Sequence, residues 1–243
     1  MASMSLSERI KQGVLLIDGA MGTELFVRGV KAGSSNNYLN VTDASVVKEV
    51  HAAYFAAGSD AVITNTFEAN GISLLRHGLA DEVAKINIEG AKIAREAAEE
   101  AAKDGRDRYV LGGLGPCGDF LEPLGMVKAE DLKAAFADQA KALVDGGVDG
   151  FIIETMTAIE EIEVAIEAVK SVCDLPVFVS LAYDGAGDEF RTMMGVDCVT
   201  AVEKLCGLGI DAIGFNCGTL DMDGYVKLAQ SYAKALAGRD VAL

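Results

Sequence analysis

The chain has 243 residues, of which 51% are hydrophobic, and a formal net charge of −16 at pH 7. This acidity argues against a nucleic-acid surface, because phosphate recognition needs clustered Lys and Arg. No apolar run approaches the roughly 20 residues that a membrane-spanning helix needs. The N-terminus lacks the apolar segment of a secretory signal, and five cysteines are scattered without close spacing. We therefore expect a cytoplasmic protein with reduced thiols and a small-molecule ligand.

Short apolar runs alternate with longer amphipathic segments along the whole chain. The apolar runs predict six strands, at 14–18, 60–66, 109–115, 150–155, 176–182 and 211–217. The segments between and after them predict six helices, at 43–57, 80–104, 128–146, 158–172, 195–208 and 222–237. We expect Gly58, Gly146 and Gly209 where helices end. Nearly continuous apolar strands that alternate with helices are typical of a parallel sheet, in a closed barrel or an open doubly wound fold.

Polar residues follow almost every predicted strand. Asp18 ends the first strand, Asn65 lies at the end of the second, and Glu154 lies at the end of the fourth. Asn216 and Cys217 end the sixth strand. An open sheet gathers its ligands at one switch point, whereas a barrel collects site residues from many strand ends around one mouth. The spread of polar residues therefore favours a barrel.

Each of these residues also has a purely structural interpretation. Asp18 and Glu154 could cap helices, but two carboxylates that face one cavity also suit the ammonium group of a ligand. The stretch "GAMG" at 19–22 is either a tight turn or a set of backbone N–H groups that could hold a carboxylate. Asn65 either caps a turn or lines the site. Four cysteines are expected to be packing residues, namely Cys117, Cys173, Cys198 and Cys206.

Several of these stretches together resemble one known family. They are "LLIDGAMGTEL", "LNVTDASVVKEVHAAYFAAGSDAVITNTFEAN", "GGLGPCGDFLEPLG", "GGVDGFIIETM" and "DAIGFNCG", which occur in matching order from about Gly13 to Cys217. The chain is similar to the homocysteine S-methyltransferases. That family includes betaine and S-methylmethionine:homocysteine methyltransferases and the homocysteine-binding module of cobalamin-dependent methionine synthase. The resemblance implies a TIM-type (β/α)8 barrel.

The resemblance also implies an activity, transfer of a methyl group to the thiol of homocysteine to give methionine, with Zn²⁺ as the activator. A thiol is a poorer nucleophile than its thiolate. Coordination to zinc removes the thiol proton and so produces the better nucleophile. By resemblance, Cys217 is the first of three zinc cysteines, and Asp18 and Glu154 hold the amino group of homocysteine. The ligand carboxylate would face Gly19, Ala20, Gly22 and Thr23, and Asn65 and Asn216 would line the pocket.

One part of the family pattern is missing from this sequence. The other two zinc cysteines of the family lie in a "GGCC" stretch at the end of strand eight, whereas this chain ends at "GRDVAL", which resembles the opening of strand seven. We expect one homocysteine-binding barrel domain over residues 1–243, truncated at its C-terminus, with about six βα units. Residues 1–12 are expected to form an N-terminal extension or helix. Cys117 is the other cysteine predicted at the same mouth, and hence a candidate substitute ligand.

Three explanations of this pattern remain open, and three functions go with them. The chain is truncated, is completed by another polypeptide or by a homo-oligomer, or is a degenerate member that binds no zinc. The first functional hypothesis is zinc-dependent methyl transfer to homocysteine from a small-molecule or corrinoid-protein donor. The second is a corrinoid-linked methyltransferase or demethylase component. The third is a non-catalytic remnant that binds an amino acid without zinc.

Overall fold

A parallel sheet forms the centre of the protein. The computed structural model describes residues 4–31, 35–186 and 189–243. The sheet holds β1 (Ala61–Ile63), β2 (Tyr109–Leu114), β3 (Gly150–Met156), β4 (Val177–Leu181) and β7 (Ala212–Phe215), in the order β1-β2-β3-β4-β7. Every neighbouring pair is parallel, so all carboxyl ends lie on one side. The last five predicted strands and the α/β class are thereby confirmed.

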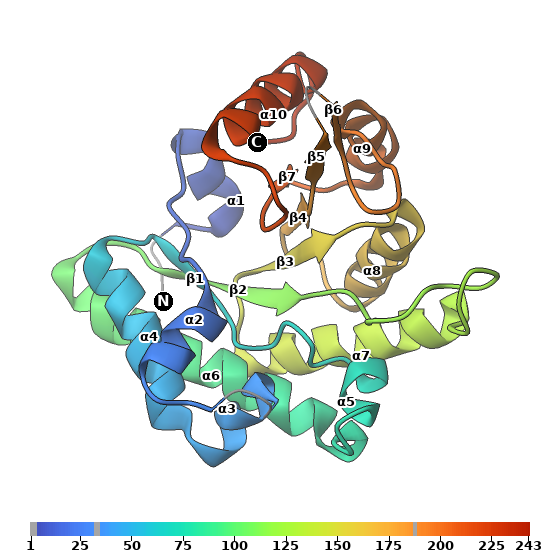
Figure 1. The fold of residues 1–243 in the computed structure, drawn as a ribbon. Coiled ribbons are helices and arrows are strands. Elements are labelled where there is room, and N and C mark those ends of the chain that lie inside the picture. Colours follow the sequence, from blue (N-terminus) through green and yellow to red (C-terminus); the bar gives the residue numbers. More distant parts are fainter. Residues whose placement is uncertain (1–3, 32–34, 187–188) are drawn as a thin grey trace.

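Helices cover the outer side of this curved sheet (Figure 1). They are α4 (Ala44–Ala57), α6 (Val83–Ala101), α7 (Ala129–Gly146), α8 (Ile159–Val172), α9 (Cys198–Leu205) and α10 (Met222–Ala235). Each packs on the next around the sheet, α4 on α6 and so on to α10. These helices correspond to the six predicted ones, shortened by a few residues. None of the helices in the described ranges is both long and apolar enough to cross a membrane.

The main core lies between the strands and these helices. All six residues of β2 are buried, as are the five residues of β4, which explains their largely apolar character. A second, smaller cluster lies on the inner face of the sheet and includes Leu111, Ile152 and Phe178. The N-terminal helix α1 (Leu6–Arg9) closes this face with Leu6, and Tyr109 Oη donates to the Met4 carbonyl at 3.1 Å. The predicted N-terminal segment therefore contains a helix against the sheet.

The prediction of a strand at 14–18 is wrong. These residues lie beside β1 but make a single bridge, Ile17 to Ala61. Val14 and Leu16 are 87% and 53% exposed. Within the described residues this segment has β1 on one side only, and a lone edge segment forms fewer ladder bonds than a strand with two neighbours. The segment still brings Asp18 to the carboxyl end of β1, where the Asp18 N–H donates to the Ala61 carbonyl at 3.1 Å.

The barrel is partial. At the far edge, Ala242 bridges to Ala212 of β7 in a parallel sense, which agrees with the predicted opening of a further strand. Nothing in the described ranges pairs residues 14–18 with residues 241–243. Between these two edges lies a cavity of about 500 Å³, lined by apolar side chains that include Val14, Ile213 and Leu243.

Several short elements were not predicted. They are α2 (Met21–Val27), α3 (Leu39–Thr42), α5 (Gly71–Leu75), the hairpin of β5 (Asp184–Ala186) with β6 (Glu189–Arg191), and one 3₁₀ turn, η2 (Asn36–Tyr38). Four further 3₁₀ turns fall within predicted segments: η1 (Ile10–Gln12) lies in the N-terminal segment 1–12, and the ends of the predicted helices 80–104 and 195–208 form η3 (Ala80–Glu82), η4 (Ala102–Asp104) and η5 (Cys206–Leu208). Such elements are too short to show a clear period. Most lie in the loops that follow the strands, and they shape the mouth of the partial barrel.

The predicted end of α7 differs by one residue. Gly146 remains helical, and Gly147 takes the left-handed conformation at φ 94° that ends the helix. The reason is packing. An ideal Cβ on Gly146 would lie 2.6 Å from Ala91 Cβ and 2.8 Å from the Ile88 carbonyl, both on α6. Gly146 thus allows α6 and α7 to approach each other, while Gly147 reverses the chain.

Replacing Gly146 with alanine should destabilise the protein, although alanine is the better helix former. A methyl group forced against the α6 backbone is expected to lower the free energy of unfolding by about 2 kcal/mol. Urea denaturation would measure this. Gly207→Ala is the matched control, because an ideal Cβ there meets nothing within 4 Å. Equal stabilities of the two variants would contradict the packing role of Gly146.

Candidate functional site

Two carboxylates lie close together at the carboxyl ends of the strands. Asp18 is partly buried, and both of its carboxylate oxygens lie 3.1 Å from the Ile63 backbone N–H that donates to them. Glu154, near the end of β3, is close enough to raise the pKa of Asp18 by repulsion. Neither carboxylate forms an ion pair with a described residue. The structure therefore brings together the two acids that the sequence predicted as a pair.

The surroundings of both acids favour their neutral forms. Burial is the main cause that raises the pKa of Asp18 to about 8; repulsion by Glu154 adds to it, and the Ile63 N–H opposes it. Burial likewise raises the pKa of Glu154 to about 7. Taking a carboxylate out of water without a cation disfavours its charge. A positively charged ligand group would supply the missing partner.

Asn216 links Glu154 to the candidate thiol. Its amide nitrogen lies 3.3 Å from Glu154 Oε2 and 3.4 Å from Cys217 Sγ. Its amide oxygen accepts from the Thr155 backbone N–H at 3.0 Å and from Ser180 Oγ at 2.6 Å. Asn216 is therefore the centre of a hydrogen-bond network that joins the ends of β3, β4 and β7.

Cys217 is exposed at the end of β7, in a tightly held turn. Its φ of 52° is left-handed, and Gly218 follows at φ 80°. A Cβ on Gly218 would lie 2.1 Å from the Tyr183 carbonyl oxygen, so glycine is required at this close approach. Tyr225, at the start of α10, donates its hydroxyl to the Cys217 carbonyl and stacks on Phe215, with ring centroids 5.7 Å apart. The thiol thus sits on a constrained backbone.

Three residues of this network were not predicted as site residues: Thr155, Ser180 and Tyr225. Ser180 is the one polar residue within the buried strand β4, a signal that could have marked it. Thr155 follows Glu154 directly, and its polar character at a strand end was visible. Tyr225 lies in a helix that carries no motif, and only the folded turn brings it to Cys217.

The predicted carboxylate-binding stretch lies at the beginning of α2. Gly19, Ala20, Gly22 and Thr23 are exposed, and Ala20 precedes the first helical residue. Tyr54 Oη donates to the Ala20 carbonyl at 3.1 Å, and a Cβ on Gly19 would lie 3.0 Å from the same hydroxyl. The stretch therefore sits directly after Asp18 and is held by α4. Its contact with a ligand carboxylate stays a prediction.

Asn65 is buried, and its side chain forms hydrogen bonds within the protein. Its amide nitrogen donates to the Asn36 carbonyl at 2.7 Å and to Asn40 Oδ1 at 3.1 Å. The Asn65 carbonyl in turn accepts from the Asn40 amide at 2.9 Å. These bonds tie the end of β1 to η2 and α3, which supports the structural interpretation. A role in lining the pocket stays a prediction.

The described residues do not form a complete zinc site by themselves. A catalytic zinc has three protein ligands and one open position. No cluster of three His, Cys, Asp or Glu in the described part of the chain could hold a metal. Cys117 is buried, its Sγ donates to the Asp119 carbonyl at 3.3 Å, and burial together with Glu161 raises its pKa to about 12. In the absence of a metal Cys117 is thus a protonated, buried thiol, as expected for a packing residue. Its role as a substitute zinc ligand stays a prediction.

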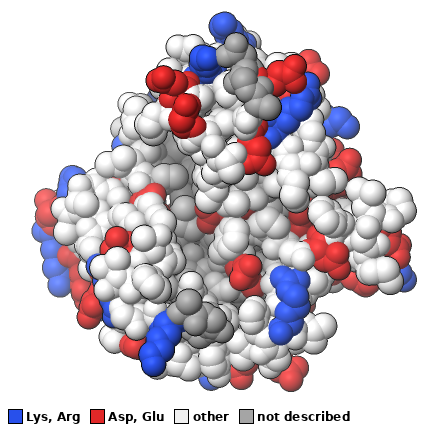
Figure 2. Space-filling model, in the orientation of Figure 1, with Lys and Arg blue, Asp and Glu red and all other residues white. Residues whose placement is uncertain are grey.

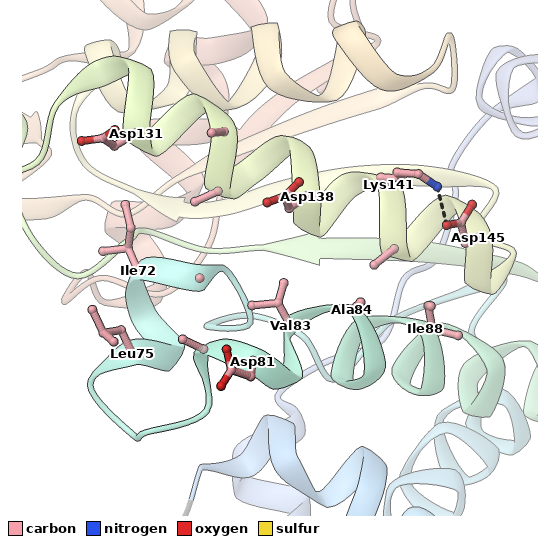
Figure 3. A pocket seen from close by; sticks show the side chains of 15 residues that line it. Ile72, Leu75, Asp81, Val83, Ala84, Ile88, Asp131, Asp138, Lys141 and Asp145 are labelled. Atoms are coloured by element: carbon pink, nitrogen blue, oxygen red, sulfur yellow. Dashed lines mark hydrogen bonds and ion pairs between the residues drawn. The ribbon is translucent and has the colours of Figure 1, made fainter.

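Two larger hollows lie away from these residues. One, of about 650 Å³, is a surface hollow between parts of α6 and α7. Asp131, Asp138 and the Lys141–Asp145 ion pair line it (Figure 3). The other, of about 1030 Å³, lies between the loop at 116–124 and α8. Neither contains a predicted site residue. On the face shown in Figure 2, acidic and basic side chains are interspersed around a mostly uncharged centre.

The raised pKa of Asp18 predicts how stability depends on pH. Between pH 4 and 8 the folded protein binds more protons at Asp18 than the unfolded chain does, so stability should fall as pH rises through this window. Asp18→Asn should reduce the loss between pH 5.5 and 8 by at least about 1 kcal/mol, near the value of one pKa unit. Urea denaturation at both pH values would measure it.

The control for this prediction is Asp240→Asn, at an exposed carboxylate near the C-terminus. That variant should keep the wild-type slope of stability against pH. A wild-type slope in Asp18→Asn would show that Asp18 is not a buried acid with a raised pKa.

The chain is similar to known proteins over most of its length. Residues 15–239 match the homocysteine S-methyltransferase family. The chain is 33% identical over 227 residues to methionine synthase of Mycobacterium tuberculosis and, equally, to that of Mycobacterium leprae, covering 88% of this chain. It spans 18% of the length of these two relatives.

The fold is also found in a solved structure. The metallated form of the homocysteine methyltransferase MmuM from Escherichia coli superposes with a TM-score of 0.80 at 23% identity, over 94% of this chain and 82% of that protein. At this identity the likeness concerns the fold, which is the TIM-type barrel expected from the strand ends. The family match over residues 15–239 shows that this chain belongs to the homocysteine S-methyltransferase family.

Proposed function

We propose that this chain binds homocysteine at the carboxyl ends of its strands and serves methyl transfer to the homocysteine thiol, which yields methionine. The observation that carries the proposal is the pair of acids, Asp18 and Glu154, with Asn216 joining Glu154 to the exposed thiol of Cys217, in a chain of this family. Two acids suited to an ammonium group and a cysteine suited to sulfur chemistry match the two ends of homocysteine.

The amino group of the ligand would lie between Asp18 and Glu154. Their raised pKa values mean that both acids must ionise to pair with an ammonium group. The ligand cation compensates the burial that disfavours ionisation, so binding and proton release are coupled. The ligand carboxylate would face the backbone of Gly19, Ala20, Gly22 and Thr23. This arrangement points the thiol of the ligand toward Cys217 and Asn216.

In the transfer step a new sulfur–carbon bond forms between homocysteine and the methyl group, while the bond between methyl and donor breaks. The electron pair of that bond leaves with the donor, and homocysteine loses its thiol proton. A free thiol of pKa about 8.5 is only a few per cent ionised at neutral pH, so the reaction needs a group that favours the thiolate. The donor, small molecule or corrinoid protein, is not specified by this chain.

Zinc is part of the proposal, but the described residues do not supply a full set of ligands for it. Cys217 offers one sulfur ligand, and two further protein ligands would be needed. The two unpaired sheet edges and the apolar cavity between them support completion of the barrel by another polypeptide segment, by a separate chain or by a second copy. We regard residues 1–243 as one homocysteine-binding domain. A reducing compartment such as the cytoplasm suits its thiol chemistry.

The presence of a single exposed cysteine also supports a second candidate function. Without further zinc ligands, the chain would bind an amino acid through Asp18 and Glu154 and would transfer no methyl group. The two functions share the binding step and differ in the need for metal. Measuring zinc content and methionine formation separates them.

Calorimetric titration with homocysteine tests the shared step. Glu154→Gln should weaken binding at least about tenfold, the value of one lost charged hydrogen bond. Wild-type binding should be tighter at pH 8 than at pH 6, because Asp18 and Glu154 ionise across this range. Cys217→Ser should retain binding in the absence of zinc, since the amino and carboxylate contacts remain.

Glu160→Gln is the matched control, at an exposed glutamate on α8 six residues along the chain, and should bind as the wild type does. Equal affinities of Glu154→Gln and wild type would refute the proposed site. Zinc bound stoichiometrically by the wild type but not by Cys217→Ser, with methionine formed from homocysteine and a donor, would favour the enzyme over the non-catalytic alternative.

A further inference from the structure

Thr155 has an unusual backbone conformation. Across the described ranges, Thr155 at φ 62° and Cys217 at φ 52° are the non-glycine residues with positive φ. A branched side chain in this region is strained by steric contact with its own backbone, and such strain persists only where the surroundings impose it. The two strained residues also touch each other, with Thr155 Oγ1 3.8 Å from Cys217 Sγ.

An irregularity in β3 produces the conformation at Thr155. The pairing of β3 with β4 shifts register between Ile153 and Met156, so the intervening residues leave the regular ladder. Bulges of this kind redirect a side chain. The Thr155 N–H, which loses its ladder partner, donates instead to Asn216 Oδ1 at 3.0 Å. Backbone strain at Thr155 is thereby tied to the residue that precedes Cys217.

The orientation of the Asn216 amide is fixed by its partners. Its oxygen accepts from both Thr155 N–H and Ser180 Oγ, so its nitrogen must face the other way. There it donates to Thr155 Oγ1 at 2.8 Å and lies 3.4 Å from Cys217 Sγ. The Thr155 oxygen is thus occupied as an acceptor, which leaves its own proton to point at the sulfur.

We propose that Thr155 is a positioning residue for Cys217, holding the sulfur in one orientation at the mouth of the site through its hydroxyl and through Asn216. Two donors, the Thr155 hydroxyl and the Asn216 amide, converge on Sγ from the side of the strands. The Cys217 carbonyl is fixed on the other side by Tyr225. The use of this sulfur in homocysteine chemistry rests on the proposed function.

Alkylation of Cys217 by iodoacetamide at pH 7.5, followed by mass spectrometry of its peptide, tests this role in the apo-protein. Thr155→Val keeps the branched shape but removes the hydroxyl, and should alkylate about threefold more slowly, since one weak hydrogen bond to sulfur is lost. Thr155→Ser restores the hydroxyl and should restore the wild-type rate. The affinity for homocysteine should change less than about twofold, because the amino-group contacts at Asp18 and Glu154 are untouched.

Thr219→Val is the matched control. Thr219 lies two residues after Cys217, but its hydroxyl donates to Asp184 at 2.7 Å, so the variant should react as the wild type does. Alkylation of Cys206, which is partly buried, reports any general loosening in the same samples. Thr155→Ala removes the same hydroxyl without the extra methyl group. If Thr155→Val loosens the fold, the alkylation rate of Thr155→Ala is measured instead.

An unchanged Cys217 rate in the variant that lacks the hydroxyl, or a Thr155→Ser rate as slow as that of Thr155→Val, would overturn the proposal. Failure of the wild type to bind homocysteine would instead refute the proposed function. The alkylation comparison does not depend on that ligand, so the two failures are distinguishable.

Discussion

Two uncompensated carboxylates determine the character of the site. Asp18 and Glu154 lie within reach of each other's charge at the ends of the strands and form no ion pair with a described residue. Burying a charge without a partner is unfavourable, so burial raises the pKa of both carboxyl groups. The arrangement is unfavourable for the stability of the folded protein, but it favours binding of a ligand that brings its own positive charge.

The rest of the site shows the same balance between stability and binding. Thr155 and Cys217 adopt backbone conformations that other residues would adopt more easily, and the bulge in β3 removes a regular ladder bond. Asn216 offsets part of this by joining three strand ends. The strain is concentrated where side chains must leave the strands and converge, while β2 and the adjoining part of the sheet are regular and fully buried. Regular strands therefore support irregular strand ends at the opening of the partial barrel.

The sequence predicted the regular part of this structure well, for a physical reason. Strands such as β2 and β4 are buried on both faces, so they are almost entirely apolar and are recognisable as short continuous apolar runs. Asp18, Glu154, Asn216 and Cys217 were found because parallel strands place their carboxyl ends on one side. Residues 14–18 failed as a strand because apolar character does not supply a ladder partner. The β5–β6 hairpin was missed because three-residue strands are too short to show alternation.

The roles of Thr155 and Tyr225 could not have come from pattern alone. A threonine after a strand is common, and only the register shift that turns its hydroxyl toward Cys217 makes it distinctive. Tyr225 reaches the Cys217 carbonyl because Gly218 lets the chain pass close to Tyr183. These contacts depend on tertiary geometry at a few tenths of an ångström, which residue type and spacing do not encode.

In the proposed function, binding and activation of the ligand are served by different parts of the sheet. The amino group would have its partners beside β1 and on β3, whereas the thiol group would meet the end of β7, two strands beyond β3. Because the two acids need no metal to act, recognition of an amino acid can persist where activation of its sulfur does not. Cys217 alone cannot complete a zinc site, so the two steps are separable within one chain. Asn216, which contacts both Glu154 and Cys217, is the residue through which they communicate.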